Sequence, residues 1–303
     1  MDFDRLITEY CEYLEVEKGY SPFTIRDYSH YLTRFSKWAH AASIRPQNID
    51  LEVVRKYRLY LSRLKCSNGN PLKRITQSYH VIALRAFLRY LLVQRDIPVL
   101  SPDKVELPRE TSRSITFLDL GQVERLLNTP DTATTIGLRD RAILEILFST
   151  GVRVSELVSL NRDHINMKHR EFGVVGKGQK PRVVFLSETA ATWLGRYLRT
   201  RQDNLKPLFI RCKGSTSDAE KMRLTARSIQ RIVEKYAKVC GLPIEISPHT
   251  LRHSFATDLL MGGADIRSVQ EMLGHESIRT TQVYTHVTNR QLRESHKAHH
   301  GRR

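Results

Sequence analysis

The chain has few of the residues that would cross-link a secreted domain or hold a metal. Its four cysteines, among 303 residues, lie far apart and form no CxxC pair. Such spacing is typical of reduced, unlinked thiols in a cytoplasmic protein and argues against a zinc site. The sequence also has no cluster of Asp, Glu or Cys for another metal and no glycine-rich P-loop for ATP. We therefore expect neither a metal nor a cofactor.

Long apolar runs are also missing. No apolar stretch approaches the length that spans a bilayer, which excludes a membrane-spanning protein. The first residues, MDFDRLITEYCEYL, are acidic and amphipathic, unlike a signal or transit peptide. The sequence thus predicts a cytoplasmic protein that makes no membrane contact.

Acidic residues are scarce relative to basic ones. The chain has 49 Lys and Arg against 32 Asp and Glu, a formal net charge of +17, and its pI is near 9.9. This excess favours a polyanionic partner, because neutralising phosphates releases condensed counterions. A ribosome-associated or merely basic protein would show the same excess, so charge alone does not decide between these classes.

The first hundred residues read as helices. Phe3, Leu6, Ile7, Tyr10 and Leu14 recur at helical spacing, and Ser21-Pro22 is a helix-start pair. Residues 51–100 carry ten Lys or Arg against two acidic residues, a net charge of +8, which favours contacts to a nucleic-acid backbone. The DNA-binding candidates that we take from this region are Arg55, Lys56, Arg58, Lys73, Arg74, Arg85 and Arg89.

The second half reads as mainly helical with one small sheet. A proline-containing segment precedes it, and the linker is predicted at 108–115. A buried helix is expected near 138–147, and strands at 172–175 and 182–186 flank a glycine-containing hairpin turn. The polar segment 210–223 is predicted to be a surface loop, and helices resume at 226. The fold class is therefore mainly α: an all-helical domain at 1–107 and an α+β domain at 116–303 with a small antiparallel sheet.

Five polar clusters in the second half carry the chemistry. They read GVRVSEL (151–157), GKGQK (176–180), SPHTLRH (247–253), LGH (273–275) and VYTH (283–286). Their cations would neutralise a phosphate, their histidines and lysine would move protons, and a phenol would be the nucleophile. Taken singly, each has an ordinary structural reading, such as an exposed Arg–Glu pair, a solvated hairpin lysine or a core tyrosine. The candidate catalytic residues are Arg153, Lys177, His249, Arg252, His275 and Tyr284, and Lys180 and Arg182 are further DNA-binding candidates.

The order of these clusters resembles the tyrosine recombinase (phage integrase) family, and within it the Xer-type recombinases. STGVRVSELVSL, GKGQKPR, SPHTLRHSFATDLL and GADIRSVQEMLGHESIRTTQVYTHV are similar to Xer blocks, and the opening EVEKGYSPFTIRDYSHYLTRF also resembles the family. The resemblance implies that Tyr284 attacks the scissile phosphate and forms a 3′-phosphotyrosyl link. The other implied roles are phosphate binding by Arg153, Arg252 and His275, general acid catalysis by Lys177, proton transfer by His249 and orientation of basic groups by Glu156.

The resemblance also implies an assembly on double-stranded DNA. The helical core-binding domain and the catalytic domain would form a C-shaped clamp around the duplex. Four protomers, of one kind or paired with a related recombinase, would pass through a Holliday junction. The tail after Tyr284 would pack into a neighbouring protomer, and a DNA translocase is a further candidate partner.

Three functions remain in competition. The first is resolution of chromosome or plasmid dimers, which would link the protein to chromosome partition and cell division. The second is integration of a mobile element by the same chemistry. The third is a DNA-binding accessory protein that does not cut, against which the intact set of six catalytic residues argues.

Overall fold

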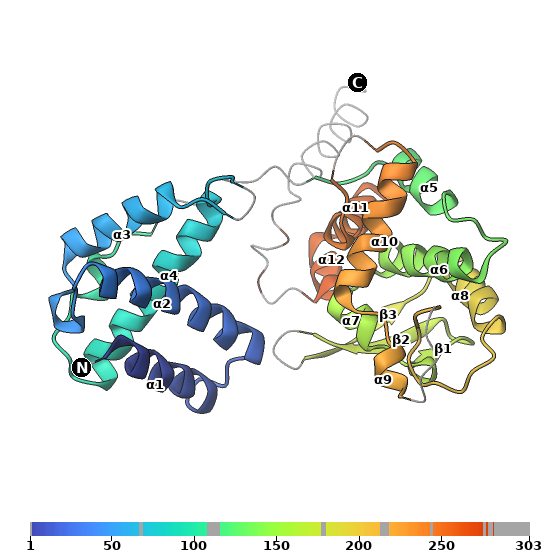
Figure 1. Ribbon diagram of the computed structural model, residues 1–303. Coiled ribbons are helices and arrows are strands. Elements are labelled where there is room, and N and C mark those ends of the chain that lie inside the picture. Colours follow the sequence, from blue (N-terminus) through green and yellow to red (C-terminus); the bar gives the residue numbers. More distant parts are fainter. Residues whose placement is uncertain are drawn as a thin grey trace, which may run out of the picture. The chain divides into compact units, whose positions relative to one another are not determined.

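The computed structural model consists of two compact units, Met1–Ser112 and Arg113–Arg303. It describes residues 2–66, 69–107, 116–176, 180–212, 218–242 and 245–274, together with Ser277 and Thr281. The predicted linker at 108–115 thus lies outside the described residues. Figure 1 shows the helices and strands of each unit. None of the helices within these ranges combines the length and the apolar character needed to cross a membrane.

The N-terminal unit is built from helices, as the sequence predicts. They are α1 (Phe3–Val16), α2 (Pro22–Ala41), α3 (Leu51–Arg63) and α4 (Arg74–Gln94), with short 3₁₀ turns at Pro46–Asn48 and Pro102–Lys104. The predicted helix start is confirmed, since the Ser21 side chain accepts a hydrogen bond from the Thr24 backbone N–H and Pro22 is the first helical residue. Asp50 caps α3 in the same way.

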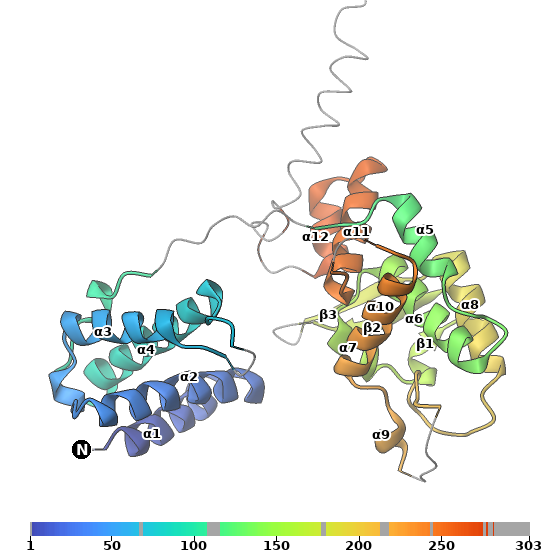
Figure 2. The same cartoon turned by 45° about the horizontal axis from the view of Figure 1, so that its top comes forward.

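The core of this unit lies where α4 packs against the other three helices, which Figure 2 shows from a second direction. The predicted apolar face of α1, from Phe3 to Leu14, is buried in it. The core also holds a polar group that the sequence did not reveal, His80, with rings of Tyr57 and Tyr31 beside it. Burial and the charge of Arg34 lower the pKa of His80 to about 4. The imidazole is therefore neutral at physiological pH.

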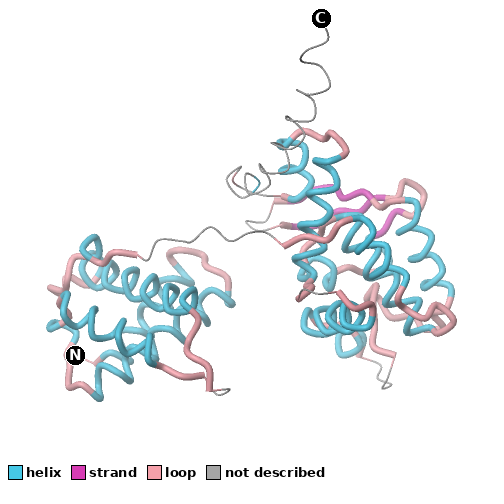
Figure 3. Tube along the Cα trace, turned by 90° about the horizontal axis from the view of Figure 1, so that it is seen from above, coloured by secondary structure: helices cyan, strands magenta, loops and turns pink. Residues whose placement is uncertain are grey.

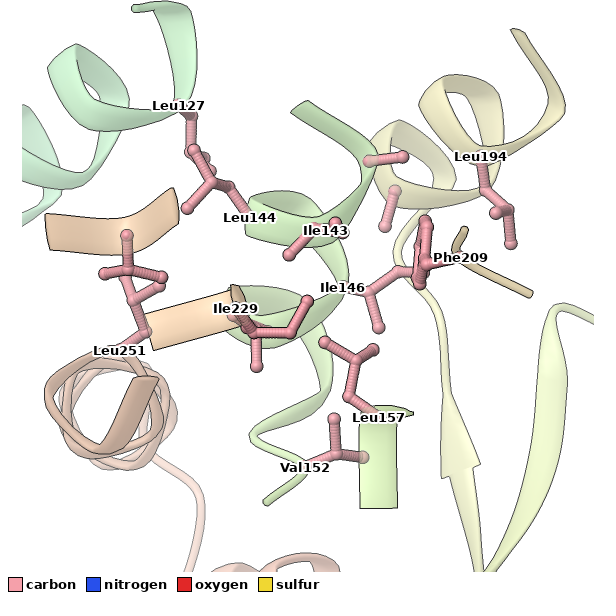
Figure 4. Close-up of a cluster of buried hydrophobic side chains, with 14 of the residues drawn as sticks. Leu127, Ile143, Leu144, Ile146, Val152, Leu157, Leu194, Phe209, Ile229 and Leu251 are labelled. Carbon is pink, nitrogen blue, oxygen red and sulfur yellow. The ribbon is translucent and has the colours of Figure 1, made fainter. Parts of the chain in front are cut away.

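Helix α6 (Thr135–Thr150) is the centre of the C-terminal unit. It packs against α5 (Leu120–Asn128), α8 (Glu188–Arg199), α10 (Ala226–Val239) and α11 (Pro248–Met261). Most residues of α6 are buried, including the ion pairs Arg139–Asp140 and Arg141–Glu145, and the predicted buried helix is confirmed. Figure 4 shows Ile143, Leu144 and Ile146 of α6 among Leu127, Leu194, Ile229 and Leu251 of the four surrounding helices.

A three-stranded antiparallel sheet lies at one side of this unit, drawn in magenta in Figure 3. Its strands, in spatial order, are β1 (Ile165–Asn166), β2 (Glu171–Val175) and β3 (Pro181–Phe185). Phe172 pairs with Val184, and both are buried on the face towards the core, whereas Val183 and Phe185 are exposed. The two predicted strands pair antiparallel, as expected, whereas residues 177–179 of the predicted turn lie outside the described residues. The third strand, β1, was not predicted.

The segment 210–223 differs from the expected surface loop. Residues 213–217 lie outside the described residues, but 219–222 form the short helix α9 (Ala219–Met222). A bridge pairs Ile210 with Arg223, and Ile210 and Met222 are buried. Arg223 also donates hydrogen bonds to the carbonyls of Val158 and Leu160, so both ends of the segment are anchored to the unit.

Candidate active site

Two helices end side by side at glycines in the left-handed conformation. Helix α6 ends at Gly151, with φ of 59°, and α12 (Ile266–Leu273) ends at Gly274, with φ of 63°. Left-handed backbone favours glycine, because a side chain there meets the following carbonyl. Gly151 is further restricted by packing, since a Cβ added to it would lie 2.4 Å from Cδ1 of Phe255 on α11. Both helices therefore present their last carbonyl oxygens at the same place.

Arg252, in the second turn of α11, joins these two helix ends. Its Nη1 donates to the carbonyl oxygen of Gly151 and its Nη2 to that of Leu273, each at 2.6 Å. The residue is 3% exposed. Helix α11 begins with Ser247 as N-cap and Pro248 as first residue, and this start fixes the turn on which Arg252 lies.

Arg153 starts the helix that follows Gly151, α7 (Val154–Ser159). Its backbone N–H donates to Oε2 of Glu156 at 2.8 Å, and its Nη1 donates to Oε1 at 2.9 Å. Its Nη2 donates to the Gly274 carbonyl at 3.1 Å. The side chain remains 31% exposed. The backbone N–H and the guanidinium of Arg153 are thus both held by hydrogen bonds, while part of the side chain stays accessible to solvent.

Glu156 is shared by two arginines. Arg182, on β3, donates from Nη1 to Oε1 at 2.9 Å and from Nη2 to Oε2 at 2.8 Å, a bidentate pair. Burial alone would raise the pKa of Glu156, but the hydrogen bonds and charges of Arg182 and Arg153 outweigh it and hold the pKa below its usual value. The carboxylate is therefore ionised. We refer to Arg153, Glu156, Arg182 and Arg252 as the arginine–glutamate cluster, which carries three positive charges and one negative charge.

Two histidines on α11 lie beside this cluster. The rings of His249 and His253 meet edge to face, with centroids 4.3 Å apart. Loss of surrounding water and the charges of Arg252 and Arg153 lower the pKa of His249. Burial, His249 and Arg252 lower the pKa of His253 to about 4. Both imidazoles are neutral at physiological pH, so each has a ring nitrogen that can accept a proton.

The structure thus brings together four of the residues singled out from the sequence: Arg153, Glu156, His249 and Arg252. Lys177, His275 and Tyr284 lie outside the described residues. Gly176 and Gly274, which directly precede Lys177 and His275, are described. Sequence reasoning missed His253, which the HTLRH spacing could have indicated, because residues four apart share a helix face. It also assigned Arg182 to DNA, whereas the Arg182 guanidinium points inward to Glu156 and the side chain is 10% exposed.

The candidate DNA-binding residues of the N-terminal unit are placed in three ways. Some form ion pairs on the surface: Arg55 and Lys56 with Glu52, and Arg85 and Arg89 with Asp103. Arg58 donates to the Glu106 carbonyl. Lys73 and Arg74 are exposed at the start of α4, as is Lys180 before β3 in the C-terminal unit. Exposed ion pairs contribute little stability, so those arginines can exchange a carboxylate for a phosphate.

The arrangement of the cluster suits an oxyanion ligand. Guanidinium groups bind phosphate oxygens through pairs of N–H donors, and they stay charged at any physiological pH. Because protein contacts already fix these side chains, binding an anion requires little further ordering. The neutral histidines nearby add proton acceptors.

Comparison with known proteins identifies relatives of both units. The model of the phage integrase family matches residues 116–291. The model described as the phage integrase N-terminal SAM-like domain matches residues 7–95.

Individual relatives extend over nearly the whole chain. Tyrosine recombinase XerD of Listeria monocytogenes serotype 4b (strain F2365) is 36% identical over 299 residues, 98% of this chain and 99% of the relative. Tyrosine recombinase XerC of Syntrophus aciditrophicus (strain SB) is 36% identical over 315 residues, 98% of this chain and 97% of the relative. A solved structure of XerH site-specific recombinase, bound to palindromic difH substrate in a post-cleavage complex, has a TM-score of 0.70 at 23% identity. It covers 96% of this chain and 83% of XerH, and at that identity the likeness is one of fold.

Proposed function

Because this chain belongs to the phage integrase family and is a tyrosine recombinase of the Xer type, we propose that Tyr284 is its nucleophile and that Arg153 and Arg252 of the arginine–glutamate cluster bind the phosphate under attack. The observation that supports this most directly is the convergence of Arg153 and Arg252 on the ends of α6 and α12. The proposed catalytic set is Arg153, Lys177, His249, Arg252, His275 and Tyr284.

In the proposed cleavage step, Arg153 and Arg252 bind the non-bridging oxygens of the scissile phosphate. The Tyr284 oxygen bonds to phosphorus as the bond from phosphorus to the 5′ oxygen breaks. His249 accepts the phenol proton, Lys177 gives a proton to the departing 5′ oxygen, and His275 hydrogen-bonds the phosphate. The products are a 3′-phosphotyrosyl link and a free 5′-hydroxyl.

The charges of the cluster favour this attack. A phenol has a pKa near 10 and is mostly protonated at neutral pH, so a positive field is needed to stabilise its anion. The cluster provides such a field with an excess of guanidinium over carboxylate. Since the phosphotyrosyl bond conserves the energy of the broken phosphodiester, a 5′-hydroxyl can reverse the attack without ATP. Rejoining with a different strand gives strand exchange.

We further propose that the two units divide the work. Residues 1–107 would bind DNA as the core-binding domain and 116–303 would be the catalytic domain, the two forming a C-shaped clamp on a recombination site. The tail after Tyr284 would contact a neighbouring protomer in a tetramer of one or two kinds of subunit, with a DNA translocase as a further partner. The proposed role is resolution of chromosome or plasmid dimers.

Covalent capture tests the chemistry and the role together. The protein is incubated with genomic DNA and denatured, and any DNA that remains attached to it is sequenced. We expect one discrete sequence from the wild type and none from Tyr284→Phe, whose DNA affinity should stay nearly unchanged. Tyr20→Phe, at an exposed tyrosine in the other unit, is the matched control.

The outcomes separate the competing functions. A site in the terminus region of the chromosome supports dimer resolution, and a site at the boundary of a mobile element supports integration instead. If Tyr284→Phe loses DNA affinity together with attachment, Tyr284 is structural and the proposed nucleophile is wrong. DNA that the wild type binds but never links covalently indicates a protein that does not cut on its own.

A further inference from the structure

Arg182 lies at the point where several parts of the site meet. Its two Nη atoms pair with both oxygens of Glu156, and its Nε donates to the Met272 carbonyl at 3.0 Å. These contacts join β3 to α7 and to the last turn of α12. The guanidinium therefore connects three segments that are far apart in the sequence.

The guanidinium of Arg182 lies where side chains at two glycines would otherwise be. A Cβ added to Gly274 would lie 3.0 Å from Nη1 and 3.2 Å from Cζ of Arg182. A Cβ added to Gly176 would lie 3.4 Å from the same Nη1 and 3.9 Å from Nη1 of Arg153. Arg182 thus packs directly against the backbone at both glycines. In the sequence, Gly176 immediately precedes Lys177 and Gly274 immediately precedes His275.

The same contacts argue against a direct role in binding phosphate. Both Nη atoms of Arg182 are paired with the buried carboxylate of Glu156, and its Nε donates to the Met272 carbonyl. To bind phosphate, Arg182 would have to leave Glu156 as a buried carboxylate with one arginine fewer. Arg153, by contrast, keeps 31% of its side chain exposed and is accessible to a ligand.

We propose that Arg182 is a positioning residue for the cleavage step. It orients Arg153 through the shared carboxylate of Glu156, and it fixes the backbone at Gly176 and Gly274. This inference rests on the proposed function, in which Lys177 and His275 act on the phosphate. A small displacement at these positions is expected to slow cleavage while leaving the affinity for DNA almost intact.

Single-turnover cleavage of the duplex recovered by covalent capture tests the inference. Arg182→Met keeps the length of the side chain without its donors, and Arg182→Lys keeps the charge without the bidentate pair. For both variants we expect a loss of about 100-fold in cleavage rate, the scale of a 1 Å misplacement, with DNA affinity within about threefold of the wild type. Arg227→Met, at a side chain that is 64% exposed on α10, is the matched control and should cleave normally.

A second substrate distinguishes positioning from general damage. When sulfur replaces the bridging 5′ oxygen, the leaving thiolate needs no proton donor. If Arg182 positions the backbone before Lys177, this substrate should restore much of the rate lost in Arg182→Met, as it should in Lys177→Ala. A fold that is merely damaged would cleave both substrates equally poorly, and that result would overturn the proposal.

Further outcomes are equally decisive. If Arg182→Lys keeps both the DNA affinity and the cleavage rate of the wild type, Arg182 acts through its charge on DNA and the proposal is wrong. If Arg182→Met does not fold, Gly274→Ala provides the test, because its Cβ displaces the guanidinium while every charge is kept; unchanged cleavage in that variant refutes the positioning role. A wild type that forms no covalent complex contradicts the proposed function itself, and the Tyr284→Phe comparison reports this independently of Arg182.

Discussion

Substitution of Gly151 by alanine is the sharpest test of how the site is built. The added Cβ would lie 2.4 Å from Cδ1 and 2.9 Å from Cε1 of Phe255, distances at which the ring must move. Alanine would also have to adopt a φ of 59°. The left-handed backbone costs about 1–2 kcal/mol, and forcing a methyl group into a packed site costs about 1–3 kcal/mol. We therefore expect Gly151→Ala to lower the free energy of unfolding by about 2–5 kcal/mol.

Gly241→Ala is the matched control for the backbone contribution. Gly241 follows Cys240, the C-cap of α10, with a φ of 67°, and a Cβ there would meet none of the described residues within 4 Å. This variant should lose only the cost of the left-handed backbone, about 1–2 kcal/mol. In a unit of this size each kcal/mol lowers Tm by about 2–4 °C, so thermal unfolding should resolve the two variants. The difference between them measures the steric clash with Phe255.

A double mutant and an activity measurement complete the test. Phe255→Leu replaces the ring that the new methyl group meets with a smaller side chain, so it should recover part of the stability lost in Gly151→Ala. Because the Gly151 carbonyl accepts from Arg252 at 2.6 Å, Gly151→Ala should also slow DNA cleavage at temperatures where the protein is folded. Equal losses in Gly151→Ala and Gly241→Ala, or no recovery with Phe255→Leu, would refute this account of the helix junction.

Three other predictions concern charge. Glu156→Gln removes the carboxylate between two arginines and should destabilise the C-terminal unit by about 3 kcal/mol in denaturant unfolding, with DNA affinity kept; an unchanged midpoint would contradict the network. His80 has a pKa of about 4 in the folded protein, below the ordinary value of 6.5, so its contribution to stability is complete above pH 6.5 and is lost as the pH falls towards 4. Urea unfolding between these pH values should show a loss of up to about 3 kcal/mol, reduced in His80→Gln, and an equal loss in that variant would show that another group is responsible. Lys73→Ala and Arg74→Ala should each weaken DNA binding and reduce the steepness of log K against log salt by about 0.9. An unchanged slope would show that the residue contacts no phosphate.

Helical periodicity accounts for most of what the sequence predicted correctly. The face from Phe3 to Leu14 is amphipathic because the helix has one neighbouring layer, and such a pattern can be read directly. Helix starts at Ser21 and Ser247 were equally readable, because a cap depends only on adjacent residues. By contrast, β1 has two residues and is defined by its partner strand, so it leaves no periodic signal.

The direction of a charged side chain is a different kind of property. Arg182 and Lys180 are two residues apart and both basic, so composition assigned both of them to DNA. Strand alternation places Arg182 on the same face as Val184, but it does not show which acceptors lie beyond that face. Glu156 and Met272 are 26 and 90 residues away from Arg182 in the sequence, and only the packed structure brings them together. Burial of His80 depends in the same way on the contact of α4 with α2 and α3.

The kind of acceptor that holds each arginine determines how much positive charge the site keeps. The N-terminus of a helix, where the dipole is positive, is the usual place for a phosphate. The described contacts of Arg252 are made instead to carbonyl oxygens at the C-terminal ends of α6 and α12, where the dipole is negative and favours a cation. A carbonyl orients a guanidinium without adding a formal negative charge, whereas the carboxylate of Glu156 must be divided between Arg153 and Arg182. Carbonyl anchoring therefore fixes Arg252 while preserving the positive field that a phosphodiester and a tyrosine anion both require.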